Sequence, residues 1–326
     1  MFHETCDRPD EARTVVEAEP VATRRESMSP ASSGWINPHL AILGCPDVPL
    51  YLIVNRESAT LVEGGLSGLT DLVWRQLNAA LEDFGGIRHL RYWAITHSHY
   101  DHCGLLTTLK PRMPWVHIVG SPGVADALQS LSAGRTRTRL DDQASQSFCA
   151  AAPAVRMGWH DVPLYPRTAG TVLDIGMGMQ LRTLPLPGHS ACQFGFHCPQ
   201  MDTLFVSDAL GEYHAPTQWL PLVFDGLADY VDSLARIEQQ GASLLALGHH
   251  GLVGGATARH AVAHAHDGLA RHRDEARAVR GDPAAADALA RRWTERHAFR
   301  SARILPQALH LASMQRMIRV LHAADT

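Results

Sequence analysis

The sequence predicts an α/β protein in which two β-sheets pack face to face and helices cover both outer surfaces, a four-layer αββα sandwich. Short apolar runs typical of strands occur in both halves of the chain, and helical segments lie between these runs. Since a sheet or an amphipathic helix has to bury its apolar face, this alternation predicts helices outside two packed sheets. A third observation, a helical pattern throughout the chain beyond residue 255, adds a C-terminal helical extension.

The composition fits one large core and excludes several functional classes. The chain has 326 residues, 45% of them hydrophobic, and a net charge of −4. A nucleic-acid-binding protein would carry a basic excess, so no nucleic-acid partner is expected. No run approaches the roughly 20 apolar residues of a membrane span, and acidic residues stand where a signal peptide would have its apolar run. We therefore expect a cytoplasmic protein without a membrane partner.

The chain divides into three predicted parts. Residues 1–34 are polar, charged and small, so they are expected to form a disordered tail, most of which a start of translation at Met28 would remove. Residues 35–255 carry the predicted sandwich. Residues 256–326 form the predicted helical extension.

Periodicity along the chain predicts the individual elements. Apolar or alternating runs predict strands at residues 49–55, 59–63, 92–95, 115–119, 193–197, 203–207 and 243–247, and a strand pair within residues 171–186. Helical spacing predicts helices at residues 70–83 and 228–240, and beyond residue 255 with breaks at 281–283 and near Pro306. Residues 121–166 are predicted to form helices and a long surface excursion.

A dense cluster of metal-binding side chains follows the predicted strand at residues 92–95. His97, His99, Asp101 and His102 form the pattern H-x-H-x-D-H. Imidazole nitrogens and carboxylate oxygens suit zinc, iron or manganese. Four such groups within six residues can converge only in a loop, and the buried strand before that loop would hold it rigid. The cluster therefore predicts a metal centre at the edge of a sheet.

Two metal ions need more ligands than this loop supplies, and later strand ends offer them. His189, Asp208 and His249 each follow a predicted strand, and a glycine precedes both histidines. The first predicted metal site consists of His97, His99 and His189, the second consists of Asp101, His102 and His249, and Asp208 bridges the two. His250 is the alternative to His249, and the glycine directly before His249 favours the latter.

In this order the motifs are similar to those of the metallo-β-lactamase superfamily. Other segments resemble one group within it, the PqsE/HmqE group of alkylquinolone-pathway thioesterases. These segments are residues 61–65, 92–106, 207–212, 219–225 and 310–317. The resemblance extends from about residue 40 nearly to the C-terminus. Many hydrolases share the metal motif, whereas the segments 207–212 and 310–317 are much more specific.

This resemblance implies a fold, an activity and partners. The fold is a metallo-β-lactamase sandwich whose C-terminal helices cap the active site. The activity is that of a metal-dependent thioesterase that hydrolyses 2-aminobenzoylacetyl-coenzyme A to 2-aminobenzoylacetate in alkylquinolone biosynthesis. The cofactors are two divalent metal ions, with iron in the isolated protein. The partners are a second copy of the chain and, as part of quorum sensing, a LuxR-type transcription factor.

Two arginine stretches bear on these partners. The arginine cluster that the group uses for regulator contact corresponds roughly to residues 271–275. This chain keeps Arg271 there beside Asp274 and Glu275, which argues against the regulator role more than against catalysis. The second stretch consists of Arg135, Arg137 and Arg139. These side chains could meet coenzyme A phosphates, but a solvated run of charges is the favoured interpretation.

The resemblance also assigns four residues to the substrate. Glu212, four residues after Asp208, would accept a hydrogen bond from the substrate's aromatic amine. By composition alone, a surface carboxylate would be the favoured interpretation of Glu212. Ser301, His310 and Ser313 lie in the predicted cap and would face the substrate, although Ser301 equally suits a helix terminus.

The expected chemistry follows from the metal ligands. Bound cations lower the pKa of water to roughly 7, and Asp101 and Asp208 are the carboxylates that would help to place the resulting bridging hydroxide against a thioester carbonyl. The thiolate leaves easily, since a free thiol has a pKa of about 8.5. Two alternatives stay open. One is another hydrolase of the same fold, such as a glyoxalase II-like thioesterase or a lactonase, and the other is a regulatory partner protein whose catalysis is secondary.

Overall fold

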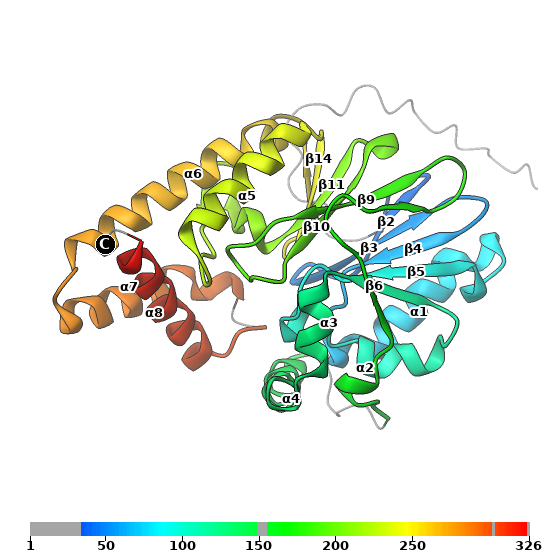
Figure 1. Cartoon of the computed structure of the whole chain (residues 1–326), viewed down its shortest axis with the longest axis horizontal. Coiled ribbons are helices and arrows are strands. Elements are labelled where there is room, and N and C mark those ends of the chain that lie inside the picture. Colours follow the sequence, from blue (N-terminus) through cyan, green and yellow to red (C-terminus); the bar gives the residue numbers. More distant parts are fainter. Residues whose placement is uncertain (1–33, 149–154, 302–303, 325–326) are drawn as a thin grey trace, which may run out of the picture.

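Two mixed β-sheets lie face to face in the middle of the structure, and helices cover the outer side of each sheet (Figure 1). The computed structural model describes residues 34–148, 155–301 and 304–324, without the side chains of residues 298–301. The predicted tail, residues 1–34, lies outside the described residues apart from Gly34, which begins the first strand. No described helix is long and apolar enough to cross a membrane.

The first sheet contains seven strands in the order of the sequence. They are β1 (Gly34–Asn37), β2 (Leu40–Cys45), β3 (Val48–Val54), β4 (Ala59–Val62), β5 (Leu90–Ala94), β6 (His117–Gly120) and β7 (Leu164–Pro166). Strands β1 to β4 pair antiparallel, and strands β4 to β7 pair parallel. The parallel strands bring their carboxyl ends to one edge of the sheet, where ligand sites of α/β proteins commonly form.

The second sheet contains six strands in the order β15-β14-β11-β10-β9-β8. Their bounds are β8 (Val172–Asp174), β9 (Gln180–Pro185), β10 (Phe194–Cys198), β11 (Thr203–Ser207), β14 (Leu244–Leu247) and β15 (Leu252–Gly254). Strands β11 and β14 are parallel, and the other pairs are antiparallel. A separate hairpin of β12 (Glu212–Ala215) and β13 (Gln218–Leu220) follows β11.

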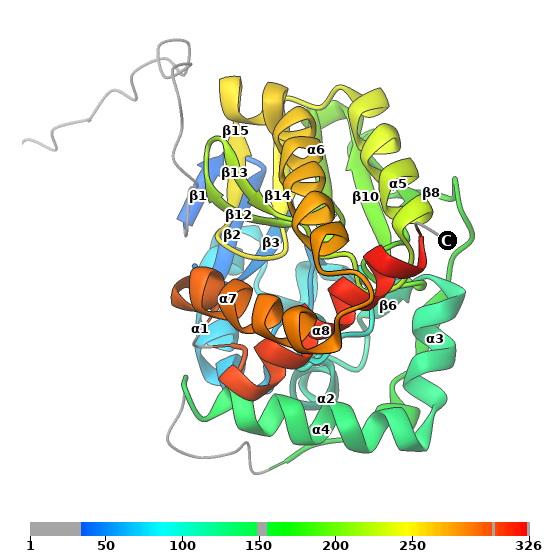
Figure 2. The same ribbon diagram turned by 90° about the vertical axis from the view of Figure 1, so that its left-hand side faces the viewer.

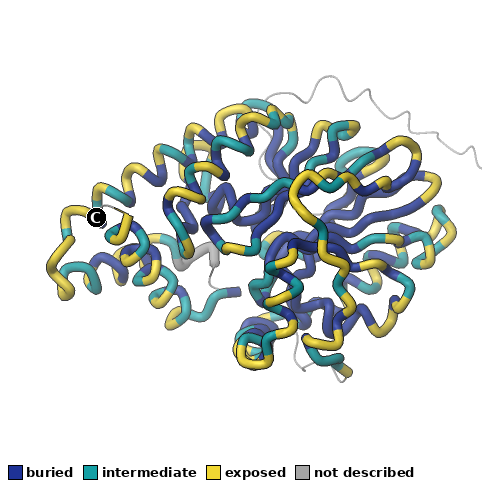
Figure 3. The backbone as a smooth tube through the Cα atoms, viewed as in Figure 1, coloured by how far each residue is buried: buried dark blue, intermediate teal, exposed yellow. Residues whose placement is uncertain are grey.

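Three apolar clusters hold the layers together. Strand β11 shows the division, because Phe205 belongs to the core between the sheets, whereas its neighbours Leu204 and Val206 pack under the helices of the second sheet. Figure 3 shows the strands as mostly buried. The alternation of side chains along a strand thus supplies one face to each core. The predicted four-layer αββα sandwich is confirmed.

Helices flank each sheet according to their apolar faces. Those beside the first sheet are α1 (Thr70–Leu81), α2 (Leu106–Leu109), α3 (Pro122–Gln129) and α4 (Leu131–Ser145), and those beside the second are α5 (Leu227–Gln240) and α6 (Gly255–Ala278). In α1 the buried residues Val73, Leu77 and Leu81 recur every four positions, which turns one stripe of the helix toward the sheet. Helix α5 ends at Gln240, and Gly241 caps it with a φ of 61° that only glycine adopts freely.

Two further helices, α7 (Pro283–Ser301) and α8 (Gln307–Ala323), complete the C-terminal part. Figure 2 shows them between α6, which packs on the second sheet, and α4, which packs on the first. Helix α8 contacts both α6 and α7. The Tyr100 hydroxyl donates a hydrogen bond of 2.8 Å to the carbonyl of Ile304, just before α8. The C-terminal extension therefore reaches back to the loop that follows β5.

The predicted elements agree with the observed ones to within a few residues, and the differences have local causes. Strand β2 was not predicted, although its run of apolar residues fits a strand that is buried on both faces. The hairpin β12–β13 was also missed, because its strands are short and carry polar residues such as His214. Within residues 121–166, the predicted helices are α3 and α4, and residues 149–154 of the predicted surface excursion lie outside the described residues.

Candidate metal centre

The loop after β5 is fixed at both ends by main-chain hydrogen bonds. The amide of Phe194 donates to the carbonyl of Thr96 at 2.8 Å, and the amide of Gly104 donates to the carbonyl of Gly65 at 2.7 Å. Between these anchors the chain makes a short 3-10 turn over Tyr100–His102. This turn lets the neighbouring side chains of the H-x-H-x-D-H pattern point to one place, which a regular helix would not allow.

Three other strand ends deliver the remaining predicted ligands, and two of them use unusual backbone. Gly188, before His189, has a φ of 120° and lies against the backbone of Tyr230, where a Cβ would collide. Ser207, before Asp208, has a φ of 51°, which is uncommon for a residue other than glycine. Strained backbone of this kind is typical of functional sites. These turns bring His189 and Asp208 to the edge where the loop after β5 begins.

The first predicted group converges as the sequence indicated. Nδ1 of His99 lies 3.1 Å from Nε2 of His97 and 2.9 Å from Nε2 of His189. Nδ1 of His189 lies 3.0 Å from the carbonyl of Leu222, so this nitrogen carries the proton and Nε2 presents a lone pair. A single proton on His99 cannot satisfy two converging acceptors. A cation between the three rings would accept all three lone pairs, and the arrangement therefore suits a metal ion.

The second predicted group lies beside the first. Oδ2 of Asp101 is 3.6 Å from Nε2 of His102 and 3.7 Å from Nε2 of His249. Nδ1 of His249 donates to the carbonyl of Asp47 at 2.7 Å, which leaves its Nε2 free to coordinate. Nε2 of His102 is buried and has no hydrogen-bond partner among the residues that the structure describes. Since buried polar atoms are almost always paired, a buried nitrogen that faces carboxylates without a hydrogen bond of good geometry is the observation that best fits a metal ligand.

Asp208 lies between the two groups. Its Oδ2 is 3.2 Å from Nε2 of His189 and 3.3 Å from Nε2 of His102, and its Oδ1 is 3.6 Å from Nε2 of His249. One carboxylate thus faces ring nitrogens of both groups. Two sets of side chains could each hold a metal ion, namely His97, His99, His189 and Asp208 in one set and Asp101, His102 and His249 in the other.

Burial and neighbouring charges shift the pKa values of these side chains in opposite directions. Burial, together with neighbouring imidazoles, holds the pKa of His97 well below its usual value, and burial lowers the pKa of His189 to about 3. Both rings are therefore neutral near pH 7 and can donate lone pairs. Burial also lowers the pKa of His102, but the carboxylates around it, Asp208 foremost, raise the net value well above the ordinary one. This local excess of negative charge favours a cation.

Glu63 is a residue of the site that the sequence did not single out. Its Oε2 lies 3.1 Å from Nδ1 of His102, and the hydroxyl of Thr96 donates to the same carboxylate at 3.0 Å. A carboxylate behind a metal-binding histidine fixes the ring and increases its basicity. Glu63 has a φ of 76° and precedes two glycines, Gly64 and Gly65. That combination of an acid and paired glycines after a strand was the available signal.

A cavity of about 830 Å³ opens onto the two groups. Its lining includes Asp208, His249 and Glu212 from the second half of the sandwich, and His310 and Ser313 from α8. His310 and Ser313 lie three positions apart, so they share one face of the helix. The C-terminal extension therefore caps the site, as predicted. The fourth predicted substrate contact, Ser301, ends α7, but its side chain is outside the described residues.

Glu212 is buried rather than a surface carboxylate, and histidines hold it. Its Oε1 lies 3.1 Å from Nε2 of His250, and its Oε2 lies 3.6 Å from Nε2 of His214. Burial raises the pKa of Glu212, but the imidazoles of His214 and His250 outweigh burial, so the net pKa lies below the usual range. Glu212 is therefore ionised. The same contact places His250 away from the metal groups and leaves His249 in them.

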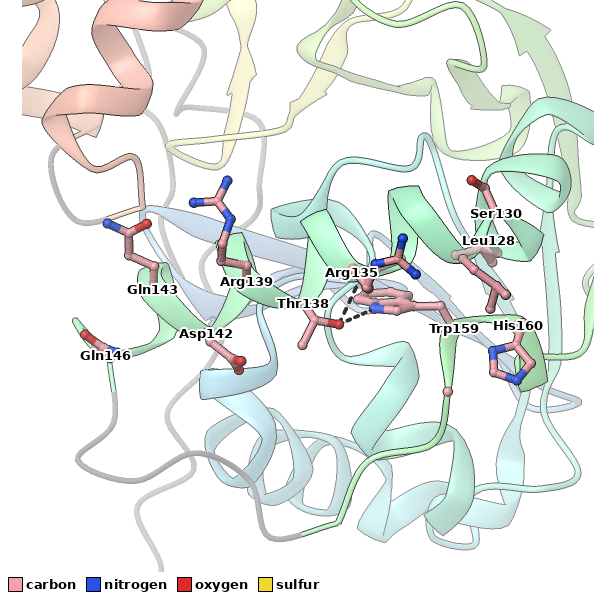
Figure 4. A pocket seen from close by; sticks show the side chains of 13 residues that line it. Leu128, Ser130, Arg135, Thr138, Arg139, Asp142, Gln143, Gln146, Trp159 and His160 are labelled. Carbon is pink, nitrogen blue, oxygen red and sulfur yellow. Dashed lines mark hydrogen bonds between the residues drawn. The ribbon is translucent and has the colours of Figure 1, made fainter.

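The arginine run is not uniformly solvated, and here the favoured interpretation is wrong for one member. Arg137 is only 6% exposed and lines the cavity at the metal groups. Arg135 and Arg139 are on another face of α4, where they line a second hollow that also contains Trp159 (Figure 4). The helical period separates these neighbours, because residues two positions apart point in different directions.

Comparisons with known sequences agree with this fold and site. The sequence profile of the metallo-β-lactamase superfamily matches residues 43–249, which is more than half of the chain. Among curated proteins, the uncharacterized protein YobT of Bacillus subtilis (strain 168) is 25% identical over 162 residues. The match covers 50% of this chain and 61% of YobT, so it spans about three fifths of that relative's length.

Solved structures show the same architecture. The metallo-β-lactamase family protein TTHA1429 from Thermus thermophilus has a TM-score of 0.61 at 21% identity, covering 87% of this chain and 94% of its own. The archaeal metallo-β-lactamase superfamily protein ST1585 from Sulfolobus tokodaii has a TM-score of 0.54 at 17% identity, covering 72% of this chain and 86% of its own. At these identities the likeness establishes the fold alone. With the profile match and the convergent histidines and aspartates, it follows that the chain belongs to the metallo-β-lactamase superfamily.

Proposed function

We propose that this chain is a dinuclear-metal thioesterase that hydrolyses 2-aminobenzoylacetyl-coenzyme A to 2-aminobenzoylacetate. The observation that carries the proposal is the convergence of two sets of metal-binding side chains at one end of a capped cavity. The resemblance of residues 207–212 and 310–317 to alkylquinolone-pathway thioesterases supports the choice of substrate. We propose iron or zinc for the ions, because nitrogen and carboxylate ligands suit both.

The predicted ligands form two sets, one for each ion. His97, His99 and His189 would hold one ion, Asp101, His102 and His249 would hold the other, and Asp208 would bridge them. Bound divalent ions supply an activated water and polarise a carbonyl. The surrounding side chains keep the ligands in place, since Glu63 orients His102 and main-chain carbonyls orient His189 and His249.

The cavity suits an aromatic acyl group with a polar tip. Leu220, Leu222, Phe224 and Leu309 give it apolar walls, which can bury a flat ring at roughly 25 cal/mol per Å² of apolar surface. Glu212 lines the same cavity as an ionised carboxylate. A carboxylate has about four acceptor positions, so Glu212 can accept from the substrate's amine as well as from His250. A thioester fits the site because its thiolate needs little help from a proton donor to leave.

The decisive experiment combines metal analysis with a thioester panel. Protein purified without oxygen should contain close to two equivalents of iron or zinc, and it should hydrolyse 2-aminobenzoylacetyl-coenzyme A. The panel includes a glutathione thioester and a homoserine lactone, because these substrates represent the alternative hydrolases. Preference for either of them would overturn the substrate assignment, and metal content near zero after reconstitution would overturn the dinuclear centre.

Asp208→Asn supplies the matched test of mechanism. The amide cannot bridge two cations as a charged carboxylate does, so we expect turnover to fall by more than about a hundredfold while the fold survives. Circular dichroism would check the fold, and near-native turnover of the variant would contradict the mechanism. A homodimer and contact with a LuxR-type transcription factor stay predictions of the resemblance, to be tested by light scattering and pull-down.

A further inference from the structure

Helix α4 separates two hollows of the molecule, and Arg137 belongs to only one of them. Ala133, Thr136, Arg137 and Leu140 line the cavity at the metal groups, and their spacing of three or four places them on one helical face. Arg135 and Arg139 line the hollow drawn in Figure 4, where their side chains extend from the same helix. Arg137 is absent from that lining.

The partners of the Arg137 guanidinium leave most of its hydrogen-bonding capacity unused. Its Nη2 donates to the carbonyl of Ala127 at 2.6 Å, and its Cζ lies 5.0 Å from the ring centroid of Trp159. Its Nε is buried and has no hydrogen-bond partner in the described ranges of the chain. A guanidinium has five N–H donors, and within the described part of the chain no carboxylate forms an ion pair with this one. A buried charge without a counter-charge is expensive.

We propose that Arg137 is an anion-binding residue of the cleft, where it receives an oxyanion, either a phosphate of the coenzyme A part of the substrate or the carboxylate of the product. This inference rests on the proposed function, because it places a substrate in the cavity beside the metal groups. The oxyanion would offset the cost of burying the guanidinium and would accept hydrogen bonds from those guanidinium N–H groups that have no acceptor in the described part of the protein. Trp159 and Ala127 hold the planar group still, which reduces the entropy lost on binding.

The walls of the cavity near Arg137 support this assignment. Ser98 and Ser190 line the same cavity and lie next in sequence to predicted metal ligands. Their hydroxyls can donate further hydrogen bonds to an anion. Glu212 reaches the cavity from β12, on the other half of the sandwich. The cleft thus has an acceptor on one side and a cationic donor on the other, which suits a substrate or product with an amine and an oxyanion at different positions.

Binding measurements without turnover test the idea. The probes are coenzyme A, which carries phosphates; pantetheine, which has the same thiol arm without phosphates; and benzoylacetate, which carries a carboxylate. Titration calorimetry would use purified metal-containing protein, wild type and Arg137→Met. We expect the variant to bind one anionic probe about ten- to hundredfold more weakly, as for the loss of a charged hydrogen bond, and to bind pantetheine unchanged. Loss of coenzyme A binding identifies phosphate, and loss of benzoylacetate binding identifies carboxylate.

Two further variants make the result unambiguous. Arg135→Met removes an arginine from the other face of α4 and should leave binding of all three probes unchanged. Arg137→Lys keeps the charge but loses the planar fork, so it should weaken the anionic probe severalfold even if Arg137→Met folds poorly. Unchanged binding of both anions by the Arg137 variants, or equal loss of all three probes, would overturn the inference. Loss of anion binding in a protein without thioesterase activity would refute the proposed function and leave the anion site standing.

Discussion

Gly248 lies directly against the carboxylate of Asp208, and a Cβ at position 248 would collide with Oδ1 of Asp208. The glycine before His249 is therefore a steric requirement of the centre. Its side-chain hydrogen leaves the space that the carboxylate occupies between the two groups of ligands.

Gly248→Ala should weaken metal binding without unfolding the protein. The methyl group has to displace Asp208, and such overpacking costs about 1–3 kcal/mol, which corresponds to about a ten- to hundredfold loss of metal affinity. Competition with a fluorescent chelator measures that affinity. Gly134→Ala is the control, because its Cβ would meet only Trp159 at an ordinary distance of 3.4 Å. Equal metal affinity in Gly248→Ala and wild type would show that Asp208 can move without consequence.

Glu212→Ala should distinguish the proposed substrate from a generic thioester. Loss of a hydrogen bond to a charged acceptor costs about 1.5–3 kcal/mol, so kcat/KM for 2-aminobenzoylacetyl-coenzyme A should fall about ten- to hundredfold. Benzoylacetyl-coenzyme A lacks the amine and serves as the control substrate, for which kcat/KM should change little. Equal losses on both substrates would mean that Glu212 acts by holding His250 and the nearby ligands.

Ser313→Trp should narrow the cleft from the side of α8. Ser313 lines the cavity, so an indole at this position would occupy space that an aromatic acyl group needs. We expect KM for the aromatic thioester to rise about tenfold or more and KM for acetyl-coenzyme A to change much less. Ala308→Trp, on an exposed position of the same helix outside the cavity lining, is the control. A KM that responds equally to both variants would speak against the cap as a wall of the site.

His297 should make the fold sensitive to acid. Burial, with His214 and His272 nearby, lowers the pKa of His297 to about 3. The unfolded chain, with an ordinary histidine pKa of about 6.5, then binds the extra proton between about pH 6.5 and 3. Stability therefore falls as the pH falls through this window, by up to about 1.4 kcal/mol per pH unit.

Urea unfolding at pH 7, 6 and 5 measures this effect. His297→Gln removes the titrating group, so its free energy of unfolding should fall less steeply than that of the wild type as the pH is lowered. The exposed His260 on α6 offers the control His260→Gln, which should follow the wild type. Parallel pH profiles for His297→Gln and wild type would contradict the prediction.

Most of the fold could be predicted from the sequence, because in the long elements the spacing of the apolar residues matches the residues that are buried. Helix α5 and strand β11 begin and end almost where predicted. The hairpin β12–β13 was not predicted, because its strands are too short to show a repeating pattern of apolar residues. Missing this hairpin affects the site, since Glu212 begins β12. Without the hairpin, a carboxylate four residues after Asp208 could equally have faced solvent.

The candidate site was predictable to the extent that its residues stand in sequence motifs. The seven predicted ligands converge, because each follows a strand and the strand ends meet at one edge. Glu63 and Arg137 were missed or misjudged for the opposite reason. What each does depends on a partner far along the chain, such as His102 for Glu63, and only the packed structure reveals such distant contacts.

The distribution of the ligands over the two sheets has a mechanical consequence. The loop after β5 belongs to the first sheet, whereas His189, Asp208 and His249 follow strands of the second. Ions held by both sets would cross-link the two halves of the sandwich much as a disulfide joins distant segments. A chelator should then lower the melting temperature of the protein, and reconstitution should restore it. A melting temperature that is the same with and without metal would mean that the apolar core alone holds the two halves together.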